Sequence, residues 1–252
     1  MMGGHYAEAT TDEAGRYTFE YLRPGTYAVA AGGALFGGAF GAQSQAGRLV
    51  RTGLEVAEGR ALEGVDFTLE DPGDIRGRAR DSRGEPVRDA AIFVRDSNGA
   101  LLDRFSMIAT DADGSFHYTG VAPGEYVVSA RGGTLASSES AAVRVVAGES
   151  ASVELVLQPG TRLVVEVEDG EGKPVEASIS VLVEHGRAVH GMLGFTEMMT
   201  SFGETGFDVA RRRIGPLPPG TYTVTATCAA GKASKPVTLD GQPERKLKLR
   251  VR

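Results

Sequence analysis

One short string of residues occurs three times in this chain, each time starting with Pro-Gly and continuing into a tyrosine-led apolar run. The copies are PGTYAV at 24–29, PGEYVV at 123–128 and PGTYTV at 219–224. Their tyrosines lie 99 and 96 positions apart, which is the length of one small domain and exceeds the period of most solenoid repeats. The chain is therefore expected to be a tandem array, whose parts we name the first, second and third repeats.

Each copy of the string predicts a turn followed by a β-strand. Proline fixes φ and glycine accepts positive φ, so the Pro-Gly pair favours a turn. Tyr, Val and Ala then alternate with other residues, which places them on one face of a strand, and we expect the tyrosines of the second and third repeats to be buried. The residues of this structural motif are Pro24, Gly25, Tyr27, Pro123, Gly124, Tyr126, Pro219, Gly220 and Tyr222.

Length and composition agree with three small domains. The chain has 252 residues, 41% of them hydrophobic, and its 35 glycines fall between short apolar runs, as in proteins where many turns separate short strands. We predict an all-β fold: a tandem array of three antiparallel β-sandwich domains with almost no helix, the first truncated at its N-terminus. The predicted domains are 1–71, 72–159 and 160–252.

The second repeat has the clearest succession of strands and turns. It opens at Ile75, and Asn98-Gly99 is a strong signal for a type I′ hairpin. Alternating aliphatic residues at 143–145 and 153–157 are expected to form the closing strands. The third repeat follows the same plan, ending in the alternation of 247–251. The junctions at 71–74 and 157–160 are too short for flexible linkers, so neighbouring domains should be closely coupled.

The first repeat lacks the opening strands that the second repeat has. It contains a turn at Asp12, the Tyr27 strand and expected closing strands through Val65, Phe67 and Leu69. In the second repeat 36 positions separate Ile75 from the matching turn, whereas only 11 residues precede Asp12. We interpret the chain as the C-terminal piece of a longer protein. The alternative is that Met1 is the true start and the first domain is degenerate.

Three motifs occur together in the second repeat. They are D-x-x-G-x-P-V at 81–87, T-D-x-x-G-x-F at 110–116 and P-G-x-Y-x-V at 123–128. This combination resembles the carboxypeptidase regulatory-like family, which implies a transthyretin-like sandwich related to collagen-adhesin B-type repeats and starch-binding-like folds. Most of the set is present in the third repeat, which departs at Glu204–Phe207, and its latter half is present in the first.

The resemblance implies a function for the array. Members of this family are non-catalytic modules of secreted or envelope-exposed bacterial proteins, so we expect a spacer or binding module with a carbohydrate or other extracellular polymer as ligand. Inward-facing tyrosines and the absence of Trp weaken direct glycan binding and favour a spacer. The alternative is a set of accessory domains of an enzyme, such as a metallocarboxypeptidase, whose catalytic domain is missing from this chain.

No pattern in the sequence predicts catalysis, a cofactor or a metal site. His5 and Glu8 have the H-x-x-E spacing of a zinc site, but no third ligand accompanies them. The acidic residues at 111–114 could suggest calcium, yet they stand where a turn prefers Asp and Gly. His185 and His190 are interpreted as an exposed hairpin tip. The single Cys228 is expected to be a small buried hydrophobe.

Two apolar stretches are candidate binding surfaces, and ordinary packing is the alternative for both. One is rich in glycine (32–40) and the other in methionine (191–199). The candidate binding residues are Phe36, Phe40, Met192, Phe195 and Met198.

Charge and hydropathy restrict the partners. A net charge of −6 without large blocks argues against nucleic acid, and no apolar stretch is long enough to span a membrane. No signal peptide is visible at the N-terminus. We expect a monomeric, elongated array that is secreted or in the cell envelope, with an extracellular polymer or protein as partner.

Overall fold

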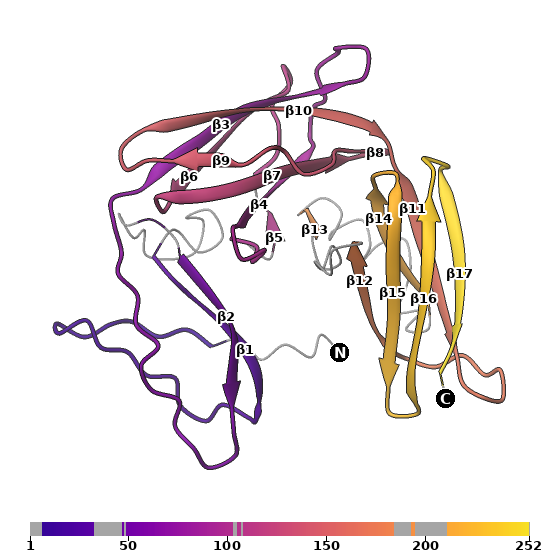
Figure 1. Cartoon of the computed structure of the whole chain (residues 1–252), viewed down its shortest axis with the longest axis horizontal. Helices are drawn as coiled ribbons and strands as arrows, with labels where there is room; N and C mark the ends of the chain where they lie inside the picture. Colours follow the sequence, from indigo (N-terminus) through magenta and orange to yellow (C-terminus); the bar gives the residue numbers. More distant parts are fainter. Residues whose placement is uncertain are drawn as a thin grey trace.

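The computed structural model of the chain describes residues 7–32, 47, 49–102, 105–106, 108–183, 193–194 and 211–251. All regular secondary structure in these residues is β-strand, which confirms the predicted all-β class (Figure 1). The first repeat contains β1 (Gly25–Ala31) and β2 (Leu49–Val56). The second contains β3 (Gly73–Asp81), β4 (Ala91–Asp96), β5 (Phe105–Ser106), β6 (Ser115–Val121), β7 (Gly124–Gly132), β8 (Leu135–Ala136), β9 (Val143–Val145) and β10 (Ser150–Pro159).

The third repeat contains β11 to β17. They are β11 (Thr161–Glu168), β12 (Ser178–Val183), β13 (Leu193–Gly194), β14 (Arg211–Leu217), β15 (Gly220–Cys228), β16 (Gly231–Leu239) and β17 (Glu244–Arg250). They form two three-stranded sheets, β14-β11-β17 and β12-β15-β16, while β13 pairs in parallel with β5 of the second repeat. In the second repeat the order is β4-β7-β8-β10-β3-β6, with β9 on β7.

The second and third repeats each contain a mixed sheet, whereas the sequence analysis predicted antiparallel sheets only. The opening strand, β3 or β11, lies beside the closing strand, β10 or β17, and runs parallel to it. On its other edge it pairs antiparallel with β6 or β14. The opening and closing strands of a repeat are far apart in sequence, and the long intervening chain provides the crossover that parallel neighbours need.

Each of these two repeats has its own apolar core. Alternation in the tyrosine-led strands is as predicted, because Tyr126, Val128 and Ala130 are buried in one core, and the corresponding residues of β15 in the other. The aliphatic residues of the closing strands complete both cores, as expected. Cys228, expected to be a small buried hydrophobe, is partly buried at the end of β15 and packs against the third-repeat core.

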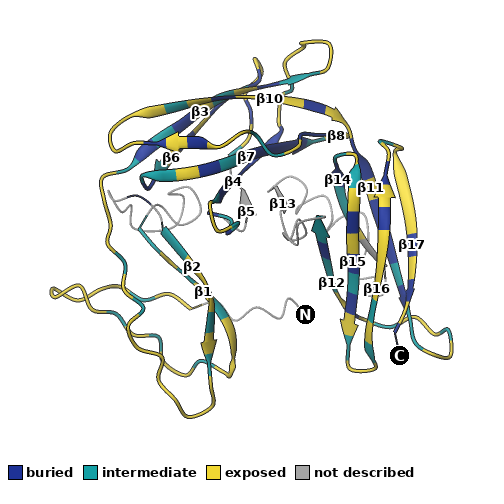
Figure 2. Cartoon of the chain, in the orientation of Figure 1, coloured by how far each residue is buried: buried dark blue, intermediate teal, exposed yellow. Residues whose placement is uncertain are grey.

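The first repeat has only one pair of strands in its described residues, and no core cluster of its own (Figure 2). The closing strand expected through Val65, Phe67 and Leu69 does not form, since residues 57–72 lie outside the strands. The reason follows from the complete repeats: a closing strand there pairs with the opening strand, and none is present in the described part of this repeat.

A single residue, Gly160, joins the second repeat to the third. Its N–H donates to the carbonyl of Thr134 at 2.8 Å, and a Cβ in its place would lie 2.9 Å from Pro216 Cβ and 3.2 Å from Ala136 Cβ. The end of β10 also pairs with β8 up to this point. Close approach of the two repeats is therefore built into the junction.

Candidate functional site

A tyrosine hydroxyl closes the Pro-Gly turn in all three repeats. Each hydroxyl donates a hydrogen bond to the backbone carbonyl four positions earlier, on the residue directly before the motif proline. The pairs are Tyr27–Arg23 at 2.8 Å, Tyr126–Ala122 at 2.8 Å and Tyr222–Pro218 at 2.7 Å. The arrangement resembles the tyrosine corner of other sandwich domains and fixes how the chain enters the strand.

The predicted burial of Tyr126 and Tyr222 is confirmed, as their exposed fractions are 4% and 3%. Burial raises the pKa of both hydroxyls to about 12, with a smaller contribution from Asp96 in the case of Tyr126. Both hydroxyls are thus neutral and committed to a backbone acceptor at physiological pH. These side chains hold the fold together and present no hydroxyl to a ligand.

Four aspartates organise turns of one design. In each, the Asp Oδ1 accepts the N–H groups two and four positions later, and a glycine with positive φ stands three positions later. They are Asp12, Asp81, Asp96 and Asp169. The backbone N–H of Arg16 holds the pKa of Asp12 below its usual value, and that of Lys173 does the same for Asp169.

The turn at Asn98-Gly99 belongs to this design, and the type I′ prediction was wrong. Type I′ requires positive φ at both central residues, but only Gly99, at 80°, has it. The Asp96 carboxylate accepts from Asn98 N at 2.9 Å and from Ala100 N at 2.8 Å, which stabilises a longer turn with glycine last.

The acidic residues considered for calcium are also occupied within their own turn. Asp113 Oδ1 accepts from the Ser115 hydroxyl at 2.7 Å and from its N–H at 3.0 Å, and Asp111 pairs with Ser115 through the backbone. Within the described residues, no three His, Cys, Asp or Glu side chains lie close enough together to hold a metal ion.

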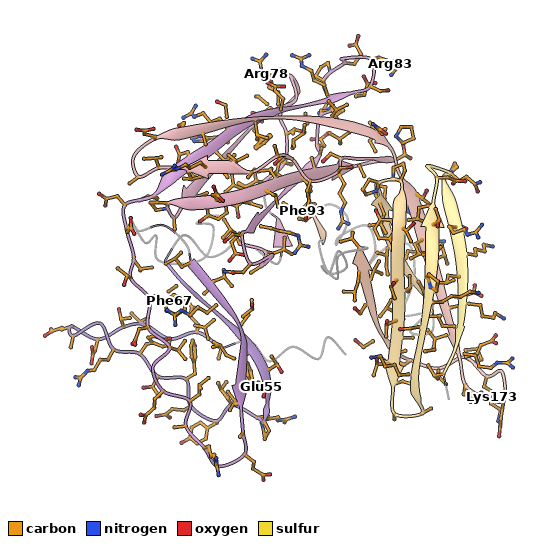
Figure 3. The ribbon with its side chains drawn as sticks, in the orientation of Figure 1. Glu55, Phe67, Arg78, Arg83, Phe93 and Lys173 are labelled. Atoms are coloured by element: carbon orange, nitrogen blue, oxygen red, sulfur yellow. The ribbon has the colours of Figure 1, made fainter. Side chains whose placement is uncertain are left out.

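A small cavity of about 280 Å³ lies where the first repeat meets the second. Its walls are β2 and residues 66–68 on one side, and residues 96–98 and 123–126 on the other. The Arg51 guanidinium lies 5.4 Å from the centroid of the Phe67 ring, which Figure 3 shows among the side chains of this repeat. The volume lies just below the usual range of small-molecule sites, so the cavity has room only for a small group.

An exposed tyrosine of the first repeat was not predicted. Tyr21 is 96% exposed and has φ of 59°, a conformation that bulky side chains rarely adopt. The position 99 residues later is Gly120, with φ of 75°. Aligning the repeats at their Pro-Gly strings would have revealed the substitution, and such a residue is a candidate contact for a partner.

Buried arginines on the second repeat were also missed. Strand β4 is buried on both faces, and on the side away from the core Arg131 stacks 4.8 Å from the Phe93 ring centroid. Arg95 donates to the Gly99 carbonyl at 2.7 Å and lies 3.5 Å from the Glu139 carboxylate. Arginine usually indicates a solvated strand position, so the sequence alone contained no signal for this packing.

The binding residues chosen from the sequence all lie outside the described residues. This holds for Phe36 and Phe40, for Met192, Phe195 and Met198, and also for the histidines at 5, 185 and 190. They remain predictions. Of the described residues, none belongs to a helix with the length and apolar character needed to cross a lipid bilayer.

Comparison with solved structures finds distant similarities. The TIE protein of Bacillus anthracis matches at 15% identity and a TM-score of 0.30, over 81% of this chain and 38% of that one. BcpA, the major pilin subunit of Bacillus cereus, matches at 7% and 0.27, over 72% and 99%. GBS52, the minor pilin of Streptococcus agalactiae, matches at 12% and 0.29, over 71% and 96%. Scores this low transfer no function to this chain.

Comparison at the level of sequence locates one family. No curated protein matches the chain. Residues 74–158 match the model of the carboxypeptidase regulatory-like domain, the family expected from the three motifs. This span includes nearly all of β3 and β10 and all of β4 to β9, together with the turns at Asp81 and Asp96 and the second tyrosine corner. The matched residues make up nearly all of the second repeat, which therefore has the sequence features of a carboxypeptidase regulatory-like domain.

Proposed function

We propose that the chain is a non-catalytic array of three β-sandwich repeats, the first (1–71) incomplete and the others at 72–159 and 160–252, acting as a spacer and binding module of a secreted or cell-surface bacterial protein. The observation that carries this proposal is the junction at Gly160, where one strand leads into the next repeat through a single, tightly packed residue. A flexible linker consists of many residues that make few contacts with the domains. A stiff spacer has short junctions whose residues pack against both neighbouring domains.

Small-angle X-ray scattering of the full chain tests the spacer role. Gly160→Ala places a Cβ 2.9 Å from Pro216 Cβ and should force the two repeats apart, which broadens the distance distribution. Gly170→Ala is the matched control, because nothing lies within 4 Å of a Cβ there. Identical scattering curves for the parent and Gly160→Ala would mean that the junction does not set the geometry.

Binding of a carbohydrate is the finer part of the proposal. The observation that favours it is Tyr21, an aromatic side chain of the first repeat that is 96% exposed. Stacking on sugars needs exposed aromatic faces of this kind. Retention of the full chain on insoluble polysaccharides, lost on Tyr21→Ala, would support binding, and no retention on any polysaccharide would leave the spacer role alone.

The second candidate is an accessory role beside an enzyme, and the observation that favours it is the regulatory-like family of residues 74–158. Peptidase assays on the purified chain, alone and with an added enzyme, distinguish the accessory role from the main proposal. Turnover of a peptide substrate that survives repurification would contradict a non-catalytic array. A change in the kinetics of an added zinc carboxypeptidase would instead favour the accessory role.

A further inference from the structure

The second and third repeats show what is absent from the described part of the first. In the second repeat β3 runs between β6 and β10, and Gly77 pairs with Phe116 on one edge and with Val153 on the other. In the third repeat β11 has the same place between β14 and β17. The opening strand is thus the centre of one sheet in both complete sandwiches.

In the first repeat, the positions that correspond to the two neighbours of Gly77 contact each other directly. Tyr17 precedes Phe116 by 99 positions and Val65 precedes Val153 by 88, so both correspond to the neighbours of Gly77. The Tyr17 hydroxyl donates to the Val65 carbonyl, and its ring lies 6.4 Å from that of Phe67. A side-chain hydroxyl therefore occupies a backbone acceptor at the level where the other repeats hold a strand.

The surrounding surface already has the alternation of a sandwich interior. Tyr17, Phe19, Val65 and Phe67 are half buried, and the residues between them are exposed, whereas the matching residues of the second repeat are buried. In Figure 2 the first repeat is drawn mostly in the exposed and intermediate colours, whereas the strands of the second repeat carry buried stretches. These apolar side chains form one face that no strand of the described residues covers.

The turn at Gly15 in the first repeat also has no strand packed against it in the described residues. A Cβ on Gly114 would lie 2.5 Å from the Ala79 carbonyl, because the turn of the second repeat packs against β3. Gly15 holds the equivalent position with nearly the same φ, 74° against 77°, yet nothing lies within 4 Å of its Cβ. The turn has formed without the strand that its counterpart contacts.

We propose that residues 17–22 and 65–69 are the two walls of an acceptor site for an extended strand of a partner polypeptide. The strand runs antiparallel to 17–22 and parallel to 65–69, as β3 does between β6 and β10. It displaces the Tyr17 hydroxyl from the Val65 carbonyl and supplies a backbone N–H in its place. This is recognition by strand addition, in which the main chain provides affinity and alternate side chains provide specificity.

The equivalent strand defines the chemistry of the occupant. The inward positions of β3 are Ile75, Gly77 and Ala79, and a Cβ on Gly77 would lie 2.6 Å from the Phe116 ring. Since Tyr17 brings a ring of similar size, we infer an aliphatic–small–small alternation for the incoming strand. A second copy of this chain does not fit, because β3 and β11 are both paired on two edges in the described residues.

The test uses the full chain and a peptide of residues 73–81 (GDIRGRARD) as the probe. The peptide is added free and, in a second version, tethered to Met1 by a flexible linker that raises its effective concentration to the millimolar range. Hydrogen exchange of the amides at 17–22 and 65–69 is the measurement. We expect tenfold or greater slowing with the tethered probe, and unchanged exchange in β7, which reports that the fold is intact.

Two variants sharpen the result. The same peptide with proline at the Gly77 position lacks the central N–H and should give no protection. Tyr17→Phe removes the competing hydroxyl, matches the Phe116 of the complete repeat, and should protect at lower peptide concentration. Absence of protection with the tethered probe, or equal protection with the proline peptide, overturns the proposal. Protection that rises with protein concentration without peptide would show self-association and overturn it as well.

Discussion

The first and second repeats contain the same string, turn and tyrosine hydrogen bond, but among the described residues only the second of these two has a core. Tyr27 and Tyr126 both donate to the carbonyl before the motif proline at 2.8 Å. Tyr126 is buried, whereas Tyr27 is half exposed. The comparison separates two levels of structure: the motif is sufficient for a turn and a strand, while burial requires an opening strand across the sandwich.

The closing segments show the same contrast at the level of secondary structure. Val65 and Phe67 have the alternation of Val153 and Leu155, yet only the latter belong to a strand. A central strand needs backbone partners, and β10 finds them in β3. Alternation of apolar residues therefore predicts which face is inward, and the presence of a neighbour decides whether the ladder forms.

The largest expected effect comes from removing the tyrosine of the complete repeat. Tyr126→Ala leaves a cavity in the second core and should cost about 3–5 kcal/mol, a large part of what a small domain has. Tyr27→Ala loses mainly a hydrogen bond and should cost about 1 kcal/mol. Native-state hydrogen exchange of β7 and β1 measures both. Equal losses in the two repeats would mean that the first has a core after all.

A glycine at the centre of β3 gives the next largest effect. Gly77→Ala would place a Cβ 2.3 Å from the Val153 carbonyl and 2.6 Å from the Phe116 ring. Overpacking of this kind costs about 1–3 kcal/mol. Gly170→Ala, with open space around its Cβ, is the control and should stay within about 0.5 kcal/mol. Chemical denaturation followed through the second repeat compares them, and indistinguishable midpoints would show that β3 can shift.

The tyrosine hydroxyls predict a loss of stability at alkaline pH. Burial raises the pKa of Tyr126 and Tyr222 to about 12, against about 10 in the unfolded chain. Their contribution is complete below about pH 10 and is lost as the pH rises toward 12. Tyr222→Phe should cost about 0.5–1.5 kcal/mol at neutral pH and reduce this alkaline dependence. Absorbance titration at high pH detects the ionisation, and two tyrosines that ionise near pH 10 would contradict the burial.

The smallest effect concerns the aspartate turns, in which the repeats should not differ. The pKa values of Asp12 and Asp169 are both held below their usual value, mainly by a backbone N–H four residues later. The stabilisation they provide is present above about pH 4 and is lost as the pH falls through their lowered pKa values. Titration of the carboxyl groups by NMR tests this. An ordinary pKa for Asp12 alone would mean that its turn needs the missing strand.

Much of the fold followed from residues that act on their immediate neighbours. Pro-Gly, Asp-x-x-Gly and the alternation after Tyr126 and Tyr222 correctly predicted turns, strands and inward faces. The type I′ prediction at Asn98-Gly99 was wrong because the Asp96 carboxylate, two residues before Asn98, accepts hydrogen bonds from the backbone N–H groups of the turn. Local chemistry of this kind could still be found in the sequence, once the side chain that accepts the turn's N–H groups is considered.

Other features depended on contacts between distant segments. The parallel pairing of β3 with β10 joins residues more than 70 positions apart. The burial of Arg95 and Arg131 on β4 and β7, and the cavity beside Arg51, likewise need surfaces that meet only after folding. The sequence by itself determined the turns, the strands of the complete repeats and their inward faces, because these depend on backbone preference and a period of two. Only the tertiary structure decided which strands pair and which face stays open, because a ladder and a core both require a partner that local sequence does not specify.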